Sequence, residues 1–151
     1  MIAIGADHGG FLLKENIIKS YEGEIEFKDF GTTSLDSVDY PDIAFQVAES
    51  VANGECEYGI LICRSGIGMC ICANKVKKIR CANVNSIKSA RLAKEHNNAN
   101  VISIAAEETT VDAAKEYIYM WLSSEFQGGR HENRIKKISE YESRNIENLK
   151  G

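Results

Sequence analysis

The chain has 151 residues, of which 44% are hydrophobic, and its formal net charge at pH 7 is −4. This length suits one domain with a full core, and the acidic balance argues against a general nucleic-acid-binding protein. No apolar run approaches the roughly 20 residues that span a bilayer, and no secretory signal is visible at the start. We therefore expect one cytoplasmic domain over residues 1–151, with no nucleic-acid or membrane partner.

The first half of the chain alternates segments with strand and helix patterns. Short apolar or alternating runs predict strands, and apolar residues that recur every three or four positions predict helices. In chain order, the expected elements are a strand over 1–5, a helix over 11–21, a strand over 24–30 and a helix over 41–52. Pro41 suits the first turn of its helix, and Gly54 follows the end of that helix. Lys14 is expected on a solvated helix face.

The second half repeats this alternation. In chain order, the expected elements are a strand over 58–63, a helix over 67–75, a strand over 80–84, a helix over 86–96, a strand over 101–105 and a helix ending near 126. Either Thr109 or Thr110 can cap the start of the last of these helices. Gly128 and Gly129 then break the chain before a charged, periodic helix over 130–149.

Strands that alternate with helices indicate βαβ units, a mostly parallel sheet and right-handed connections. No linker, low-complexity segment or repeat divides the chain. The sequence therefore predicts a single α/β domain. Its last helix follows the final βα unit, so this helix could cover the sheet or reach another subunit.

The cysteines and histidines argue against a structural zinc site. Five cysteines occur at irregular spacing without a CxxC pair, and the three histidines lie far apart in the sequence. Cysteines in apolar or strand-like segments are typical of reduced, buried thiols in cytosolic proteins. Four of the five have that setting, namely Cys63, Cys70, Cys72 and Cys81.

The most informative segment is the end of the third strand, where Cys63 is followed by Arg64-Ser65-Gly66-Ile67-Gly68. Ligands of open α/β sheets bind at the carboxyl ends of the strands, and exposed N–H groups beside a helix start favour negative charge. The same field favours the thiolate form of Cys63, which could act as a base or a nucleophile. The alternative is that Cys63 only ends a buried strand.

Three familiar anion-binding loops do not fit this segment. It contains no P-loop pattern, and Ile71 stands where a dinucleotide fingerprint needs its third glycine. A tyrosine-phosphatase loop needs an arginine where this chain has Met69. Which anion the loop holds is therefore open at this stage.

Asp7 and His8 close the first strand and are expected beside Cys63 if the first and third strands are neighbours. The alternative is that Asp7 caps a helix and His8 lies on the surface. His96 ends a helix, where a histidine ordinarily complements the helix dipole. In its own chain His96 is then expected far from Cys63, a difficulty that a second subunit would resolve.

Arg130 and Arg134 are four residues apart, so they share one face of a helix. Two guanidinium groups on one face match a phosphate dianion through their planar donor forks. The alternative is a solvated basic surface.

With these segments assembled, the chain resembles ribose-5-phosphate isomerases of type B and the related galactose-6-phosphate isomerase subunits, from Ile2 to about Glu142. The resemblance rests on residues 5–10, 38–41, 59–63, 65–68, 73–75, 95–101 and 128–131. It implies a Rossmann-like three-layer α/β/α fold with a five-stranded parallel sheet, and a C-terminal helix that extends to a partner subunit. It also implies a homodimer or dimer of dimers with shared active sites, which interconverts ribose 5-phosphate and ribulose 5-phosphate without metal or cofactor.

The resemblance also implies the role of each site residue. Cys63 is the base that moves a proton between C2 and C1, and the N–H groups of residues 65–68 stabilise the enediolate oxygen. The Ser65 hydroxyl helps to move protons between O1 and O2. His96 of a neighbouring subunit opens the sugar ring, with Asp7 close by. The remaining implied contacts are His8, Arg130 and Arg134 to the phosphate, Gly66, Ile67, Gly68 and Asn97 to the sugar or enediolate, and Tyr40 to the pocket wall.

Two residues depart from the family pattern. Arg64 replaces a small residue, usually glycine, directly after the base, and Glu107 stands where many relatives place an arginine near the phosphate. Glu107 could instead pair with one of the expected phosphate ligands. The preferred sugar is open, since a hexose 6-phosphate of the allose or galactose type is the alternative substrate. The alternative of a different class is a flavodoxin-like phosphate-binding domain.

Overall fold

Five parallel strands form one sheet in the order β2-β1-β3-β5-β4. The computed structural model describes the backbone of residues 1–150 and the side chains of residues 1–144. The strands are β1 (Ile2–Ala6), β2 (Phe27–Asp29), β3 (Tyr58–Cys63), β4 (Cys81–Asn83) and β5 (Val101–Ala105). Each predicted strand is present, and the parallel βαβ arrangement is confirmed.

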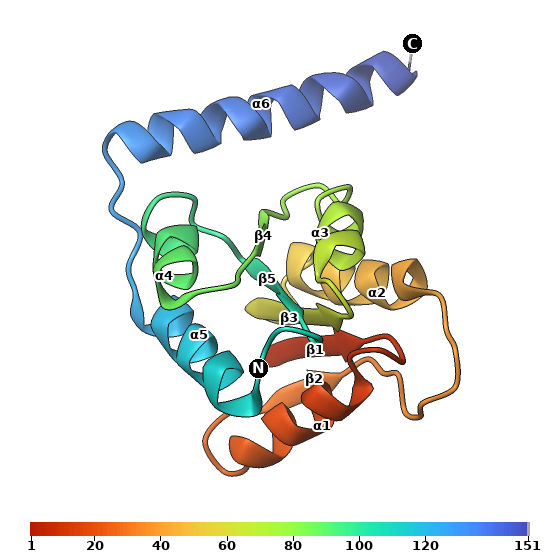
Figure 1. Ribbon diagram of the computed structural model, residues 1–151. Helices are drawn as coiled ribbons and strands as arrows, with labels where there is room; N and C mark the ends of the chain where they lie inside the picture. Colours follow the sequence, from red (N-terminus) through yellow and green to blue (C-terminus); the bar gives the residue numbers. More distant parts are fainter. Residues whose placement is uncertain (151) are drawn as a thin grey trace.

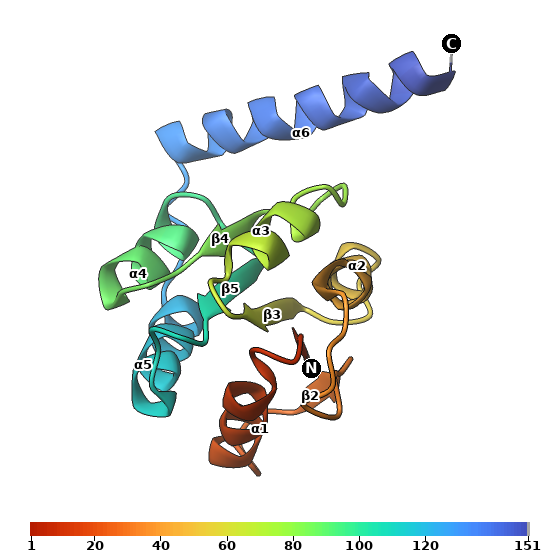
Figure 2. The same ribbon diagram turned by 45° about the vertical axis from the view of Figure 1, so that its right-hand side comes forward.

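Helices cover both faces of the sheet, as Figure 2 shows. The helices on one face are α1 (Phe11–Ser20), α4 (Ile87–Glu95) and α5 (Val111–Ser123), and those on the other are α2 (Tyr40–Ala52) and α3 (Ile67–Ala73). The long helix α6 (Arg130–Lys150) passes beyond the edge of the sheet formed by β4 (Figure 1). The three-layer α/β/α fold is therefore confirmed.

The alternation of side chains along each strand divides the core into two parts. Ile60 and Ile62 of β3 point into the cluster beneath α1, α4 and α5, whereas Leu61 and Cys63 belong to the cluster beneath α2 and α3. Burial on both faces explains why this strand is a continuous apolar run instead of an alternating one. It also places the Cys63 side chain on the face that carries α2 and α3.

The two edge strands are shorter than their sequence patterns predict. β2 pairs only with β1 and β4 only with β5, so the ends of the predicted segments 24–30 and 80–84 lack a partner strand. On the open side of β4, the Asn74 side chain bonds both the N–H and the carbonyl oxygen of Cys81, at 2.8 and 2.9 Å. Asn74 thus covers part of an edge that would otherwise invite pairing with another strand.

Several helix ends are settled by local contacts. Of the two candidate caps for α5, Thr110 is the one whose side chain accepts from a backbone N–H, that of Ala113 at 3.1 Å. Ser86 and Ser89 form a reciprocal capping box at the start of α4.

None of the helices that the structure describes is both long enough and apolar enough to cross a membrane.

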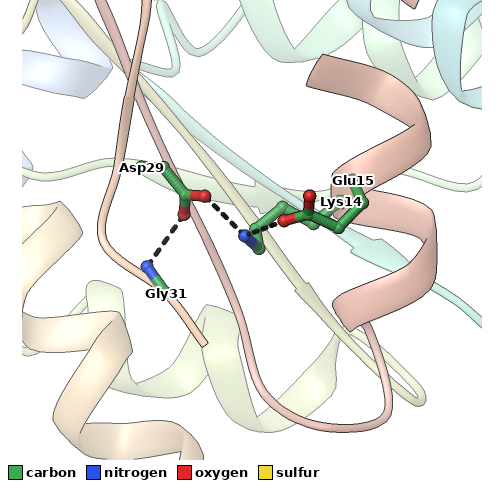
Figure 3. Close-up of polar contacts among 4 residues, drawn as sticks. All are labelled: Lys14, Glu15, Asp29 and Gly31. Atoms are coloured by element: carbon green, nitrogen blue, oxygen red, sulfur yellow. Dashed lines mark hydrogen bonds and ion pairs between the residues drawn. The ribbon is translucent and has the colours of Figure 1, made fainter. Parts of the chain in front are cut away.

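The expectation that Lys14 lies on a solvated helix face is wrong. Its side chain is fully buried, and its Nζ contacts Asp29 Oδ2 at 2.7 Å and Glu15 Oε1 at 2.8 Å (Figure 3). Asp29 also accepts from the N–H of Gly31 through its second carboxylate oxygen, at 2.8 Å. A buried ammonium needs such carboxylate partners, and they tie α1 to the end of β2.

Candidate active site

The carboxyl ends of β1 and β3 lie side by side, so the loops that follow them meet at one edge of the sheet, here called the carboxyl edge. Ala6 pairs with Ile62 in the register of these two strands, and the N–H of Asp7 donates to the carbonyl oxygen of Ile62 at 3.3 Å. Asp7 and Cys63 are therefore neighbours, as the sequence predicted.

Cys63 is buried, with 5% of its surface exposed, and its Sγ accepts a hydrogen bond from the N–H of Gly66 at 3.2 Å. Gly66 has a φ of +76°, a left-handed conformation that turns the chain into α3 and aims this N–H at the sulfur. A Cβ at Gly66 would lie 2.7 Å from Asn83 Oδ1, so the site also lacks room for a side chain. The contact stabilises negative charge on Cys63.

Cys72 lies close to Cys63 but is suited to a different role. Burial raises the pKa of the Cys72 thiol, and the negative charge that Cys63 can carry raises it further. Cys72 is therefore a neutral thiol at physiological pH and is poorly suited to act as a base.

Some N–H groups of the loop after Cys63 donate to acceptors within the same segment. The N–H of Ile67 donates to Ser65 Oγ at 3.2 Å, beside the bond from Gly66 to the Cys63 sulfur. Two of the four N–H groups expected to hold an oxyanion thus have partners inside the loop. Ser65 is exposed, so its hydroxyl proton is available to a ligand.

Tyr40 forms one wall beside this loop. It begins α2, and a Cβ built on Gly68 would lie 2.6 Å from the ζ carbon of the Tyr40 ring. Only a glycine at position 68 lets the ring approach so closely. Tyr40 is 39% exposed, which leaves part of the ring facing solvent or a ligand.

Asp7 and His8 both have structural partners. Asp7 Oδ1 accepts from the N–H groups of Gly9 and Gly10, at 2.9 and 3.1 Å. His8 Nδ1 accepts from the N–H of Val38 at 3.2 Å. Since an accepting nitrogen carries no proton, a neutral His8 holds its proton on Nε2 and can donate it to a ligand. Asp7 keeps a second carboxylate oxygen, Oδ2, which can accept a hydrogen bond from a ligand hydroxyl.

Arg64 and Glu107 form an ion pair across the loops after β3 and β5. Arg64 Nε lies 3.3 Å from Glu107 Oε1, and both side chains are largely exposed. Glu107 thus pairs with Arg64, and not with His8, Arg130 or Arg134, the expected phosphate ligands.

His96 lies at the other end of the sheet. Helix α4 runs from the carboxyl end of β4 back to the start of β5, and His96 is its C-cap. Four residues later, the carbonyl oxygen of Asn100 accepts from the N–H of Gly59 near the start of β3. His96 is therefore separated from Cys63 of the same chain by the length of the sheet, as expected from its place at the end of a helix.

His131 belongs to the one basic cluster that the sequence offers for an anionic ligand, namely Arg130, His131, Arg134, Lys136 and Lys137, and in the fold it contacts His96 directly. The two imidazole rings stack with centroids 4.2 Å apart and an interplanar angle of 13°. Burial lowers the pKa of His131, and the nearby His96, Arg130 and Arg134 lower it further. The Gly128–His131 segment of the sequence contained this residue, but only the fold shows that it meets His96.

Arg130 and Arg134 are exposed at the start of α6, close enough to influence His131. Neither makes an ion pair with any side chain in the part of the chain that the structure describes. Asn97 is also exposed in this region, and its carbonyl oxygen accepts from Arg80 Nε at 3.0 Å. We call this group, His96, Asn97, Arg130, His131 and Arg134, the amino-edge cluster.

The predicted site residues therefore form two groups within one chain. Asp7, His8, Tyr40, Cys63, Ser65 and residues 66–68 lie together at the carboxyl edge, and the amino-edge cluster lies at the opposite end of the sheet. The thiol of Cys63 belongs to the first group, and the two arginines without an ion pair belong to the second.

The family described as "Ribose/Galactose Isomerase" matches residues 2–138. The chain belongs to this family. A Bacillus subtilis relative named as a putative sugar phosphate isomerase, YwlF, is 47% identical over 147 residues, covering 96% of this chain and 99% of that protein.

Solved structures of the ribose/galactose isomerase family share the whole fold. A ribose-5-phosphate isomerase B of Clostridium thermocellum has a TM-score of 0.92 and 45% identity, covering 95% of this chain and 97% of that one. A ribose-5-phosphate isomerase B of Mycoplasma genitalium with bound ribulose-5-phosphate has a TM-score of 0.89 and 41% identity, covering 94% and 95% of the two chains.

Proposed function

We propose that this protein interconverts ribose 5-phosphate and ribulose 5-phosphate through an enediolate, with Cys63 as the base. The observation that carries the proposal is a buried thiol at the end of β3 whose sulfur accepts the N–H of Gly66 at 3.2 Å. Family membership and the ribulose-5-phosphate in the Mycoplasma genitalium relative support the choice of substrate.

The proposed reaction moves one proton between neighbouring carbons. The Cys63 thiolate takes the proton from C2 of the open-chain aldose, and the electron pair of that C–H bond forms the C1–C2 double bond of the enediolate. The thiol then returns the proton to C1, which yields the ketose and restores the thiolate. N–H groups of the 65–68 loop offset the negative charge on oxygen, and the Ser65 hydroxyl moves a proton between O1 and O2.

We propose that ring opening and phosphate binding need residues from both edges. His96 would act as acid and base on the furanose ring, with the second oxygen of Asp7 close to the ring hydroxyls. Nε2 of His8 and the guanidinium groups of Arg130 and Arg134 would hold the phosphate. Asn97 would bind the sugar, and Tyr40 would line the pocket.

Because the two groups lie at opposite ends of the sheet, we propose a homodimer in which each active site combines the carboxyl edge of one copy with the amino-edge cluster of the other. Helix α6 supports this arrangement, since Ile138 and Tyr141 are 47% and 65% exposed on it. A cavity of about 480 Å³, lined by Ile138 and Arg80 among others, also lies between α6 and the β4 edge of the same chain. A partner subunit would cover such a surface.

The test is proton exchange coupled to turnover. Ribose 5-phosphate incubated with the protein in heavy water should gain deuterium at the exchanging carbon. Cys63→Ala should reduce kcat by about 100-fold or more, the usual contribution of general base catalysis. Cys72→Ala is the matched control, because it removes a neighbouring buried thiol that carries no role in the proposal. Equal activity of the Cys63→Ala protein and the wild type would refute the base assignment.

A sugar panel separates the alternatives for the substrate. Purified protein should act fastest on ribose 5-phosphate and more slowly on allose 6-phosphate or galactose 6-phosphate. Faster turnover of a hexose 6-phosphate would move the proposal to that substrate. Binding of phosphate without turnover of any sugar would instead favour the flavodoxin-like binding domain.

We also propose that the protein works in the cytoplasm. Its five cysteines are free thiols, a state that a reducing compartment preserves.

A further inference from the structure

The Arg64–Glu107 ion pair is expected to contribute little to the stability of the fold. The Arg64 and Glu107 side chains are 68% and 61% exposed, and the Nε–Oε1 distance is 3.3 Å. Exposed pairs of this kind contribute only about 0–1 kcal/mol to stability. The two loops are already joined by backbone hydrogen bonds, from Ala106 N–H to the Cys63 carbonyl oxygen at 2.9 Å and from Glu107 N–H to that of Arg64 at 3.1 Å.

Arg64 is placed close to the proposed reaction centre. It directly follows the base Cys63, and its Cβ lies 3.4 Å from the position that a Cβ on Gly9 would take. Gly9 in turn follows His8, a proposed phosphate ligand. The Arg64 side chain therefore begins beside the loop that carries His8, and its guanidinium reaches the loop that carries Glu107.

Arg64 also provides the only fixed positive charge in these loops. The loops at the carboxyl edge span residues 7–10, 30–39, 64–66, 84–86 and 106–110, and Arg64 is the single lysine or arginine among them. The carboxylates of the same loops are Asp7, Asp36, Asp39, Glu107 and Glu108. Within one chain, a phosphate dianion that approaches this edge thus meets one fixed cation among several carboxylates, and in the proposed homodimer Arg64 would act beside the arginines of the other copy.

We propose that Arg64 is a substrate-binding residue that exchanges Glu107 for the phosphate of the incoming sugar. A guanidinium binds phosphate through two parallel N–H···O bonds, and this contact is stronger than an exposed contact to one carboxylate oxygen. Glu107 acts as an internal competitor, because it holds Arg64 in place when the site is empty and must be displaced when substrate binds. This inference rests on the proposed function and adds a specificity residue to it.

The exchange predicts that removing Arg64 and removing the charge of Glu107 change the KM for ribose 5-phosphate in opposite directions. Arg64→Ala should raise the KM for ribose 5-phosphate about 10-fold or more, because a charge-assisted hydrogen bond to the phosphate is lost. Arg64→Lys should raise it less. Glu107→Gln should lower the KM, because the competing carboxylate is gone while the side chain keeps its shape. In all three variants kcat should change little, since Arg64 is proposed to hold the phosphate and not the reacting carbons.

Inorganic phosphate serves as a second probe that does not require turnover. Its inhibition constant, or its dissociation constant by calorimetry, should rise in Arg64→Ala and fall in Glu107→Gln. Lys28→Ala is the matched control, because Lys28 forms another exposed ion pair, with Glu55, that is remote from the carboxyl edge. Lys28→Ala should change neither constant.

A shift in the same direction for Arg64→Ala and Glu107→Gln would overturn the exchange, as would unchanged KM and phosphate affinity in both. Loss of thermal stability in both, without a change in phosphate affinity, would show the pair to be structural and would also overturn it. If the wild type turned over no sugar phosphate, the proposed function would fail. The phosphate measurements would then still decide whether Arg64 binds this anion.

Discussion

The imidazole ring of His131 lies parallel to that of His96, with centroids 4.2 Å apart, and thereby fixes the start of α6 against the end of α4. The backbone supports the same contact, because the N–H of Gln127 donates to the carbonyl oxygen of Glu95 at 3.0 Å. These contacts bring the arginines of α6 next to His96. The stacked pair therefore organises the amino-edge cluster.

The pKa of His131 predicts how stability depends on pH. Burial and the neighbouring His96, Arg130 and Arg134 lower this pKa from its ordinary value of 6.5. Between 6.5 and the lower folded pKa, the unfolded chain binds a proton that the folded chain does not, so stability rises with pH. The contribution of His131 is therefore complete above pH 6.5 and declines as pH falls through the range below it.

Urea unfolding at pH 7.5, 6.0 and 5.0 measures this dependence. The wild type should lose stability toward pH 5, and His131→Gln should lose less over the same range, because the titrating group is gone. His8→Gln is the matched control for removal of a histidine. An identical pH profile for the wild type and His131→Gln would contradict the prediction.

Substitutions of Asp7 separate its structural role from its proposed chemical role. Asp7→Asn keeps an oxygen that can accept from the N–H groups of Gly9 and Gly10. Its stability should stay close to that of the wild type, while kcat falls by about 100-fold if the charged carboxylate assists ring opening. Asp7→Ala should in addition lose about 1–3 kcal/mol of stability, because the half-buried N–H of Gly9 and the buried N–H of Gly10 lose their acceptor.

Thermal unfolding and initial rates, measured on both Asp7 variants, check this prediction. Rates for Asp7→Asn that equal those of the wild type would leave Asp7 with only its structural role. Measurements on open-chain analogues that need no ring opening should show a smaller loss, which ties the effect to that step.

Gly68 and Tyr40 should depend on each other. In Gly68→Ala the new Cβ would lie 2.6 Å from the Tyr40 ring, which must move away. Because this ring is partly exposed, we expect a stability loss below about 1 kcal/mol together with a higher KM. The double variant Gly68→Ala/Tyr40→Ala should have the KM of Tyr40→Ala alone, since the clash is then absent. Full additivity of the two single effects would argue against this contact.

Gly66→Ala should behave differently from Gly68→Ala. It introduces a Cβ at a φ of +76° and within 3.1–3.2 Å of the backbone of β5, which cannot move aside like an exposed ring. We expect a loss of about 2–4 kcal/mol, combining left-handed strain with overpacking. Chemical denaturation compares the two variants directly, and equal losses would show that the two glycines have the same role.

Cys70 should be the most reactive thiol of the chain toward alkylation, although the proposed mechanism does not use it. A hydrogen bond from the Cys81 side chain is the main cause that lowers the pKa of Cys70 to about 6, with further bonds from Ser103, Asn83 and Asn74. The pKa of Cys81 is raised by the same contact and by burial. Labelling of Cys70 should therefore reach half its maximal rate near pH 6.

Mass spectrometry after brief iodoacetamide treatment at pH 5 to 9 measures the rate at each cysteine. Cys70→Ser should remove the fast phase, and Cys81→Ala should slow it, because Cys70 loses the hydrogen bond that favours its thiolate. A half-maximal rate near pH 9 would contradict the assigned environment.

The fold could be predicted from the sequence to a large extent, because local patterns determine the elements. The apolar run over 58–63 and the glycine turn after it predict a buried strand followed by a helix, and both are present. The edge strands β2 and β4 were predicted too long, since the limits of a strand depend on which neighbour it pairs with. The burial of Lys14 could not be predicted either, because its partner Asp29 comes from another element.

The sequence by itself determined the order of strands and helices and placed Cys63, Asp7 and His8 at the ends of strands, because hydrophobic periodicity and turn residues act locally. Only the tertiary structure decided which of these residues meet. Strand order brings Asp7 to Cys63, the stacking of His131 on His96 positions the start of α6, and Arg64 turns to Glu107. Such contacts join residues that lie far apart in the chain, and they form only when the parallel sheet fixes which strands, and therefore which loops, are neighbours.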